Sequence, residues 1–465
     1  MSDTSFASLA LPAALLTNLD TLGYHEMSPV QAESLPPMLA GRDVLAQAKT
    51  GSGKTAAFGL ALLAKLQVES FAVQGLVLCP TRELADQVAE ELRRLARGMA
   101  NVKILTLCGG APFGPQLGSL EHGAHIVVGT PGRIDEHLRK GSLALDSLAM
   151  LVLDEADRML DMGFQATIDD IIADTPTDRQ TLLFSATFPD EQSSGGLTEM
   201  TRGVVRNPVT VKIAEVHDAS TIQQHFYSVA NEEARFDALC QLLLTYRPAT
   251  SVVFCNTKRE TQAVAEQLTD AGFSAVALNG DLEQKDRDRI LILFANQSVS
   301  ILVATDVAAR GLDIAQLDAV FNYQIARELD VHVHRVGRTG RAGASGIACT
   351  LVTPKESYRL ERLEGLLEQA IKTEPMPKPQ HSVPFEPPMA TLQLAGGKKD
   401  KLRPGDILGA LTSEGGLRGE QVGKIKVLAR SAYVAVERSV IQQAQAKLER
   451  DKLKGRAFRV RRIRY

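Results

Sequence analysis

The sequence predicts two doubly wound α/β domains in tandem, followed by a smaller α+β domain. Short, continuously apolar runs alternate with helical periodicity between Asp43 and Thr210, and the same scheme repeats from about residue 223 to 370. Such runs are typical of parallel strands that are covered on both faces. A proline-rich stretch then separates these repeats from a C-terminal segment with a different order of elements. The 465 residues are enough for two or three separate cores.

In the first domain, which we expect at residues 1–206, apolar runs mark the strands and helical patterns such as 84–98 connect them. The runs are VLA (44–46), LVLCP (76–80), HIVVGT (125–130), MLVLDEAD (150–157) and TLLFSAT (181–187). A linker at 207–220 is expected to lead to the second domain at 221–370. Its runs are SVVFCNT (251–257), SAVALNG (274–280), SILVATD (300–306) and IACTLVT (347–353).

Residues 371–389 contain six prolines, which predicts an extended, semi-rigid spacer. Residues 390–465 then show a β-α-β-β-α-β order, which is the pattern of RRM-like domains. The expected elements are a strand at 390–394, a helix at about 404–411, strands at 423–429 and 432–437, a helix at 440–447 and a strand at 457–463.

The composition is that of a soluble globular protein, with 44% hydrophobic and 23% charged residues. The five cysteines lie far apart without a CxxC pair, so we expect buried free thiols and no metal site or disulfide. No Lys or Arg precedes Arg42, so a charged signal-peptide start is absent, and no apolar run approaches a membrane span. We therefore expect a cytoplasmic protein.

The charge is unevenly distributed along the chain. Residues 390–465 contain 18 Lys and Arg against 7 Asp and Glu, a net charge of +11. Because the whole chain carries −3, the preceding residues carry −14. A strongly basic module behind an acidic body predicts that the module binds a polyanion. A basic segment that only improves solubility is the alternative.

The stretch AKTGSGKT at 48–55 predicts a phosphate-binding loop. It follows an apolar run and precedes a helical one, the setting in which backbone N–H groups surround phosphate oxygens. Lys54 is expected to reach the β- and γ-phosphates, and the Thr55 hydroxyl to bind Mg²⁺. Ala48 stands where the strict pattern has its first glycine.

The sequence DEAD at 154–157 ends an apolar strand, where an α/β sheet presents its ligands. We expect Asp154 to hold Mg²⁺, directly or through water, and Glu155 to orient and deprotonate the attacking water. An acidic helix cap is the structural alternative.

With these motifs in order, the first ~370 residues resemble the DEAD-box ATP-dependent RNA helicases, whose core consists of two RecA-like domains. Phe6 and Tyr24, together with SPVQ at 28–31, resemble the adenine-reading Q motif, in which Gln31 reads the base. The remaining motifs are PTREL (80–84), Gly109–Gly110, TPGR (130–133), SAT (185–187), VFCNT (253–257), GDLEQKDR (280–287), ATDVAARGLD (304–313) and HRVGRTGR (334–341). Asn279 departs from the family, which often has His at this position.

The resemblance implies ATP and Mg²⁺ as cofactors. Arg338 and Arg341 would be arginine fingers for the γ-phosphate, and with Arg335 their spacing of three predicts that they line one side of a turn. His334 would lie beside the fingers. The implied ATP-binding residues are Phe6, Tyr24, Gln31, Ala48, Thr50, Gly51, Ser52, Gly53, Lys54, Thr55 and Asp313, and those coupling ATP to RNA are Asp157, Ser185 and Thr187. Because the phosphate loop and the fingers lie in different domains, hydrolysis is expected to require domain closure.

The resemblance also implies a set of RNA-contacting residues in the core. They are Thr81, Arg82, Gly110, Thr130, Arg133, Gly280, Arg287 and Thr305. Hydroxyls, glycine amides and arginines suit a phosphodiester backbone and carry no base code, so this surface is expected to be sequence-independent.

Sequence specificity is therefore expected from the C-terminal module. The strand that would carry stacking aromatics has only Tyr433, so base stacking on the sheet is not predicted. The stretches at 396–411 and 423–427 resemble the C-terminal domain of DbpA-type bacterial helicases, which bind a 23S rRNA hairpin and act in large-subunit assembly. The expected RNA-binding residues there are Lys398, Lys399, Lys401, Arg403, Lys424 and Lys426.

The sequence thus favours an RNA-stimulated ATPase that unwinds short duplexes in 23S rRNA, acting as a monomer without DNA or membrane partners. Two alternatives stay open. One is a general RNA-remodelling helicase with a non-specific basic tail, and the other is an ATP-gated RNA clamp or scaffold that binds without separating strands. No function is predicted for residues 193–200.

Overall fold

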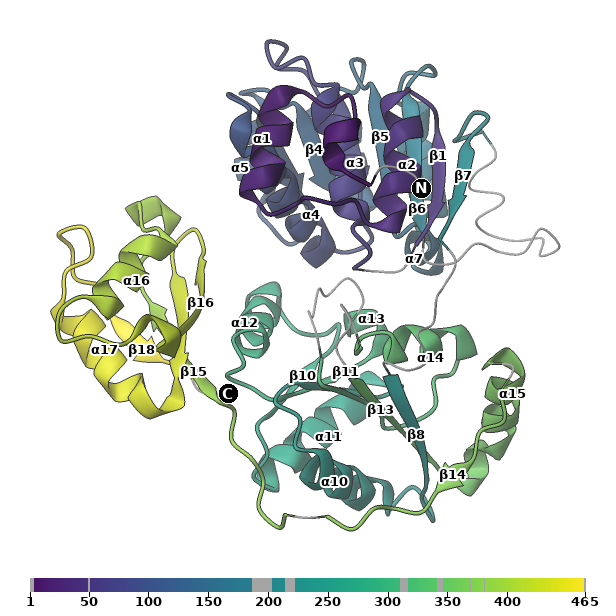
Figure 1. The fold of residues 1–465 in the computed structure, drawn as a ribbon, viewed down its shortest axis with the longest axis vertical. Coiled ribbons are helices and arrows are strands. Elements are labelled where there is room, and N and C mark those ends of the chain that lie inside the picture. Colours follow the sequence, from purple (N-terminus) through teal and green to yellow (C-terminus); the bar gives the residue numbers. More distant parts are fainter. Residues whose placement is uncertain are drawn as a thin grey trace. The chain divides into compact units, whose positions relative to one another are not determined.

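The computed structural model describes residues 4–48, 51–185, 203–213, 222–309, 317–340, 346–367, 369–379 and 381–463 (Figure 1). The chain forms two compact units, which divide at about residues 216 and 217. Among the described helices, none combines the length and the apolar character needed to span a membrane. Within the described ranges all five cysteines are free thiols, four of them buried, as expected.

The first unit contains a seven-stranded parallel sheet with the strand order β3-β4-β2-β5-β6-β1-β7. Its strands are β1 (Val44–Gln47), β2 (Gly75–Leu78), β3 (Ile104–Leu107), β4 (Ile126–Gly129), β5 (Met150–Asp154), β6 (Gln180–Ser185) and β7 (Val209–Lys212). The two edge strands, β3 and β7, were not predicted. Strand β7 pairs with β1, so the sheet extends into the segment that was expected to be a linker.

Helices cover both faces of this sheet. They are α1 (Ala13–Thr21), α2 (Pro29–Leu39), α3 (Lys54–Ala64), α4 (Arg82–Leu95), α5 (Phe113–Leu120), α6 (Pro131–Arg139), α7 (Ala156–Asp161) and α8 (Gln165–Ala173). Helices α1 to α4 pack on one face, and α6, α7 and α8 contribute to a second core on the other. The predicted doubly wound α/β fold is confirmed.

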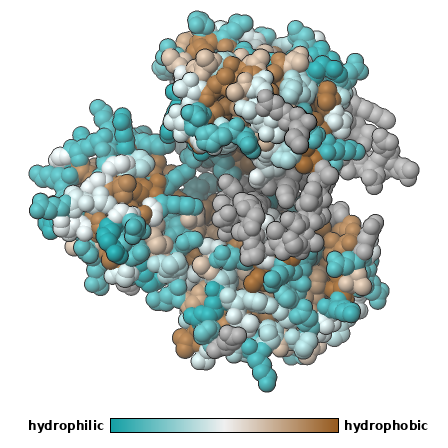
Figure 2. Space-filling model, in the orientation of Figure 1, coloured by the Kyte–Doolittle hydropathy of each residue, from teal (hydrophilic) through white to brown (hydrophobic). Residues whose placement is uncertain are grey.

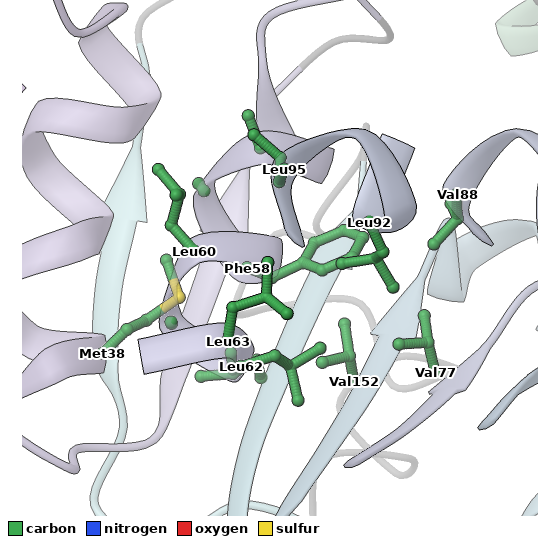
Figure 3. Packing of buried hydrophobic residues seen from close by; sticks show 14 of the residues in the cluster. Met38, Phe58, Leu60, Leu62, Leu63, Val77, Val88, Leu92, Leu95 and Val152 are labelled. Carbon is green, nitrogen blue, oxygen red and sulfur yellow. The ribbon is translucent and has the colours of Figure 1, made fainter. Parts of the chain in front are cut away.

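Helix α3 is buried on almost every side and packs against the sheet, α2 and α4 (Figure 3). Phe58 contacts Phe184 of β6 with ring centroids 5.4 Å apart. Gly59 permits close approach of α4, because a Cβ at this position would lie 2.8 Å from Cδ2 of Leu92. An apolar helix fixed on all sides places its N-terminus, and hence the phosphate loop, at one edge of the sheet.

The second unit begins with another seven-stranded parallel sheet, of order β10-β11-β9-β12-β13-β8-β14. Its strands are β8 (Ile222–Ser228), β9 (Ser251–Phe254), β10 (Ala275–Leu278), β11 (Ile301–Ala304), β12 (Ala319–Asn322), β13 (Gly346–Val352) and β14 (Thr373–Glu374). Its helices are α10 (Arg235–Tyr246), α11 (Lys258–Asp270), α12 (Gln284–Ala295), α13 (Asp306–Ala309), α14 (Leu329–Val336) and α15 (Ser357–Leu367).

The proline-rich segment is attached to this sheet domain and is not a free spacer. It begins with β14, which pairs with β8, and the Gln241 side chain then donates to the Pro377 carbonyl. Further along, Phe385 packs edge-on against Phe273 and lies under the Arg247 guanidinium. The sequence could not show these contacts, because each depends on a residue more than 100 positions away.

The C-terminal module has the predicted RRM-like order. It consists of β15 (Met389–Leu394), α16 (Pro404–Thr412), β16 (Val422–Val427), β17 (Ala432–Glu437), α17 (Ile441–Arg450) and β18 (Val460–Arg462). The four antiparallel strands lie in the order β16-β17-β15-β18, and both helices pack on one face of the sheet.

The second sheet domain covers the middle of the opposite face of the module's sheet, around Thr391 and Tyr433. Thr391 is buried and its hydroxyl contacts Asn296 Nδ2 at 3.1 Å and Ser298 Oγ at 2.7 Å. Tyr433 packs in one hydrophobic cluster with Leu293 at the end of α12. Buried polar groups with matched partners fix one geometry, because any displacement leaves them unsatisfied. The middle of the face on which an RRM usually stacks bases is therefore occupied by protein, whereas Lys426 and Arg461 on the same face stay exposed.

We expect Leu92→Ala to destabilise the first unit by about 2–5 kcal/mol, the usual range for a leucine truncation in a closed core. Leu92 is fully buried between α4 and α3. Urea unfolding followed by circular dichroism measures the loss. The matched control is Leu408→Ala, because Leu408 is 40% exposed and its truncation leaves no cavity. A loss below about 1 kcal/mol for Leu92→Ala would contradict this account of how α3 is held.

Candidate functional site

The phosphate-binding loop joins β1 to α3, as predicted. Gly51 and Gly53 have φ angles of +85° and +96°, in the left-handed region that favours glycine. The Ala48 amide donates to the Ser185 carbonyl at 3.0 Å, so the start of the loop is tied to the end of β6. The described part of the predicted loop therefore has the glycine conformations expected of a tight turn. Thr50 lies outside the described residues.

Three buried polar atoms around this loop have no hydrogen-bond partner in the structure: Lys54 Nζ, Ser52 Oγ and Asp154 Oδ1. Lys54 and Asp154 are only 6% and 3% exposed. Buried charged groups are costly unless they are paired, so orphaned atoms of this kind mark a ligand site. An ammonium group beside a hydroxyl and a carboxylate matches the donor and acceptor needs of a nucleotide phosphate with its Mg²⁺.

Burial raises the pKa of Asp154 to about 6, although the nearby Lys54 ammonium acts in the opposite direction. Among the described residues, no cluster of three or more His, Cys, Asp or Glu side chains could hold a metal ion. Mg²⁺ commonly takes one or two protein ligands and completes its shell with phosphates and water. Thr55 and Asp154 therefore fit a nucleotide-bound Mg²⁺.

Glu155 adopts a left-handed backbone conformation (φ 54°, ψ 51°) between β5 and α7. Its Oε2 accepts a hydrogen bond from Arg158 Nη1 at 2.9 Å, and both side chains are buried. Sequence reasoning missed Arg158. The available signal was an arginine three positions after an acidic residue, the spacing of neighbours on one helix face.

The segment resembling the Q motif binds the phosphate loop directly. The Gln31 side chain accepts from the Ser28 amide and donates to the Gly53 carbonyl at 3.1 Å, while Ser28 Oγ donates to the Ser52 carbonyl at 2.8 Å. A Cβ on Gly53 would lie 2.6 Å from Gln31 Nε2. Gln31 and the loop therefore form one connected structure.

The two aromatic residues assigned to ATP are packed inside the first unit. Phe6 is buried and meets Tyr24 edge-on, with centroids 6.2 Å apart. The Tyr24 hydroxyl accepts from Arg94 and lies 3.1 Å from the Glu91 carboxylate. These contacts anchor Tyr24 to α4.

The proposed coupling residues follow the same sheet edge. Asp157 accepts from the Arg158 amide within α7, and the fully buried Ser185 ends β6 next to the phosphate loop. Thr187 lies outside the described residues, as do residues 193–200.

The three arginines at 335, 338 and 341 were expected to line one side of a turn. Instead Arg335 points into its domain, where it is 1% exposed and bonds to both carboxylate oxygens of Asp306 and to Asn256. Arg338 lies in the turn after α14 and is buried, and His334 lies one residue before Arg335 on that helix. Arg341 and Asp313 lie outside the described residues. Tertiary packing turned Arg335 inward, which spacing alone could not predict.

In the first unit the expected RNA-contacting residues gather where three neighbouring strands end. Thr81 follows β2, Gly110 follows β3 and Thr130 follows β4. The Arg82 guanidinium lies directly against Gly110, where a Cβ would leave 1.6 Å to Nη1. Gly110 (φ +73°) therefore has to be a glycine.

Arg133 is held in place by the protein itself. Its guanidinium donates to the Ala111 carbonyl and to Gln116 Oε1, and it pairs with Glu136 at 3.0 Å. Phe113 beside it is stacked on His137 with centroids 4.2 Å apart. These bonds preorganise Arg133 at the edge of the sheet.

In the second unit, Gly280 and Thr305 follow the neighbouring strands β10 and β11. Arg287, on the first turn of α12, donates to the Ala308 carbonyl at 2.9 Å. The structure therefore brings these three predicted residues to one edge of the second sheet.

The six basic residues predicted in the C-terminal module are all exposed. Lys398 and Lys399 lie in a short 3-10 turn, Lys401 follows in a left-handed conformation, and Arg403 precedes α16. Lys424 and Lys426 lie on the edge strand β16. Figure 2 shows hydrophilic side chains over much of this module.

Three family models match the chain. Residues 28–194 match the DEAD/DEAH box helicase model, residues 234–343 the helicase conserved C-terminal domain, and residues 391–462 the DbpA RNA binding domain. Over 98% of its length the chain is 52% identical to the ATP-dependent RNA helicase DbpA of Escherichia coli, of which it covers 99%. It is also 43% identical, over 78% of its length, to the DEAD-box ATP-dependent RNA helicase CshA of Bacillus cereus, of which it covers 68%.

A solved structure of Dbp5 from S. cerevisiae bound to RNA and ADP BeF3 is similar in fold. It is 29% identical, with a TM-score of 0.72, over 80% of this chain and 96% of the other.

We expect Gly53→Ala to weaken ATP binding by at least about tenfold, equivalent to 1.4 kcal/mol. An added Cβ would both strain the left-handed backbone and push Gln31 off the loop. Titration with a fluorescent ATP analogue measures the affinity. Gly163→Ala is the matched control, since Gly163 has a φ of +77° but no heavy atom within 4 Å of the added Cβ. Equal affinities for the two variants would contradict the contact between Gln31 and the loop.

Proposed function

The chain belongs to the DEAD-box ATP-dependent RNA helicases, and we propose that it separates short RNA duplexes in 23S rRNA during assembly of the large ribosomal subunit. One observation carries this proposal. A helicase core with an orphaned, buried Lys54 and Asp154 is joined in one chain to a basic domain that matches the DbpA RNA binding domain.

In the proposed mechanism the first unit binds ATP through the phosphate loop. Lys54 neutralises the β- and γ-phosphates, while the loop amides from Gly51 to Thr55 surround them. Phe6, Tyr24 and Gln31 shape the adenine end. Thr55 and Asp154 would hold Mg²⁺, which when bound supplies positive charge to the phosphate oxygens.

Glu155 is the proposed general base. Its carboxylate takes a proton from the attacking water, whose oxygen then bonds to the γ-phosphorus as the bond to the β-γ bridging oxygen breaks. Arg338 and Arg341 are proposed to stabilise the charge that develops on the γ-phosphoryl group, with His334 beside them and Asp313 near the ribose. Such arginines contribute roughly 10³ to 10⁵ in rate in this class of enzyme.

RNA is proposed to bind the core through its backbone. Thr81, Arg82, Gly110, Thr130 and Arg133 offer hydroxyl, amide and guanidinium donors at one sheet edge. Gly280, Arg287 and Thr305 do so at the other sheet. Asp157, Ser185 and Thr187 are proposed to couple this binding to ATP turnover.

Selectivity for the ribosomal hairpin is proposed to come from the basic rim of the C-terminal module. Lys398, Lys399, Lys401 and Arg403 are exposed, whereas Tyr433 on the sheet face is covered. The contacts of Thr391 with Asn296 and Ser298 hold the module on the domain that carries Arg287. An RNA hairpin bound to this rim would therefore be presented to the second sheet domain in a constant position.

We expect Lys54→Ala to reduce RNA-stimulated ATP turnover to background, because no other described cation lies orphaned beside Asp154. Hairpin binding by the full-length variant, measured by fluorescence anisotropy, should stay within about twofold of the unsubstituted protein, since the module lies in the other unit. Substantial turnover by Lys54→Ala would overturn the proposed ATP chemistry.

Steady-state ATP hydrolysis at one salt concentration tests the RNA target. The activators are a 23S rRNA fragment with the peptidyl-transferase hairpin, an unrelated structured RNA, and poly(A). We expect stimulation by the rRNA fragment to be at least about tenfold greater than by the others, equivalent to 1.4 kcal/mol of coupling.

The triple substitution of Lys398, Lys399 and Lys401 by Ala should abolish that preference, whereas Lys355→Ala, at an exposed lysine outside the module, should keep it. Equal stimulation by all three RNAs would instead support a general RNA helicase. Binding of duplex RNA with ATP hydrolysis but without strand release would indicate an RNA clamp.

A further inference from the structure

The buried ion pair between Arg158 and Glu155 lies next to the orphaned atoms of the nucleotide site. Only 6% of the Arg158 side chain and 5% of the Glu155 side chain are exposed, and Arg158 Nη1 donates to Glu155 Oε2 at 2.9 Å. Asp154, which precedes Glu155, ends β5 and has an oxygen without a partner. The pair is thus formed at the site where the phosphate and its attacking water are expected to bind.

The local backbone makes the orientation of Glu155 depend on its partners. Glu155 is one of the few described non-glycine residues with positive φ, and its left-handed conformation opens the six-residue helix α7. A non-glycine residue in this region is strained and persists only where surrounding contacts impose the conformation. Arg158 is one turn further on the same helix, so its guanidinium acts as a brace across that turn.

A buried carboxylate that an arginine holds at one oxygen has restricted rotational freedom. Removing one partner of a buried pair leaves an uncompensated charge, which is strongly unfavourable, so the pair stays formed. The bond from Arg158 to Oε2 therefore restricts the orientations that the carboxylate can adopt. Proton transfer from water requires that plane to be aligned within hydrogen-bond reach of the attacking water.

We propose that Arg158 is a positioning residue that orients the Glu155 carboxylate for activation of the attacking water. This inference rests on the proposed function, in which Glu155 is the general base. Arg158 touches neither nucleotide nor water in this role and acts only through Glu155. A merely structural part in holding α7 is the competing explanation, and the two differ in what they predict for kcat and for ATP affinity.

The test uses full-length Arg158→Met, which keeps an apolar stem of similar size but removes the charge and the donors. We expect kcat for RNA-stimulated ATP hydrolysis to fall by about 10- to 100-fold, the loss typical of a misaligned catalytic group. The KM for ATP and the affinity for a fluorescent ATP analogue should stay within about twofold of the unsubstituted protein. The reason is that Arg158 makes no contact with the nucleotide in this role, so ground-state binding of ATP is unaffected. Arg158→Lys should recover a substantial part of kcat, because an ammonium can still donate to Oε2.

Arg179→Met is the matched control. Arg179 is also a buried arginine of the first unit, but it donates to the Pro176 and Val204 carbonyls and precedes β6, at the opposite end of that strand from Ser185. A lower melting temperature with an unchanged kcat is expected for this variant. If Arg158→Met and Arg179→Met lose stability, ATP affinity and kcat in parallel, Arg158 is a structural residue and the proposal is overturned.

A double-mutant comparison separates this inference from the proposed function. If Glu155 is the base, Glu155→Gln alone lowers kcat strongly, and adding Arg158→Met to it should cause no further loss. An active Glu155→Gln variant would refute the general-base assignment itself. An inactive Glu155→Gln together with an Arg158→Met whose kcat is within twofold of the unsubstituted protein would refute the role of Arg158 alone.

Discussion

The burial of helix α3 is the constraint on which the nucleotide site depends. Its residues from Ala56 to Leu63 are almost completely enclosed, so the helix cannot shift without opening the largest hydrophobic core of the first unit. Lys54, the first residue of this helix, is therefore held in a desolvated position near Asp154. Burying the charges of Lys54 and Asp154 without hydrogen-bond partners is unfavourable in the free protein. A bound phosphate with its metal would supply the missing partners and remove this desolvation penalty. The core residues of α3 thus contribute to ligand binding without contacting the ligand, because they hold Lys54 in its desolvated position.

Some arginines in the helicase motifs also act by fixing their neighbours and not by contacting a ligand. Arg335 and Arg133 resemble ligand-binding residues in their sequence motifs, yet both have several bonds to the protein. For Arg335, at 1% exposure, these bonds join the strand ends at Asn256 and Asp306 to helix α14. Its contribution is to fix the neighbouring residues, including the turn that carries Arg338. Arginine suits this role because its planar group donates in several fixed directions.

Central elements could be predicted from the sequence, and edge elements could not. Strands β2, β4, β5 and β6 are covered on both faces and appear as continuous apolar runs. Strands β3, β7 and β8 lie at or near sheet edges, and their polar residues break that pattern. Strand β12 is buried and was not predicted, although it has the same four-residue length as β2 and β4. The phosphate loop was found because its function fixes local residue types, whereas Arg158 and Arg335 act through partners that only the folded chain defines.

The partly covered sheet face of the C-terminal module limits the ways in which the module could recognise a specific RNA. An RRM that stacks bases needs its sheet face open, but here Thr391 and Tyr433 of that face contact the second sheet domain. The proline-rich segment, fixed through Phe385 and Gln241, reinforces the same placement. The rim that remains offers mainly Lys and Arg, which bind phosphates strongly but distinguish bases poorly. The proposed recognition of one hairpin would then depend on RNA shape, that is, on the spacing of the phosphate charges along a folded backbone. A rim whose basic side chains are held at fixed positions would favour RNAs with matching phosphate positions, whereas a flexible basic tail would adapt to any RNA.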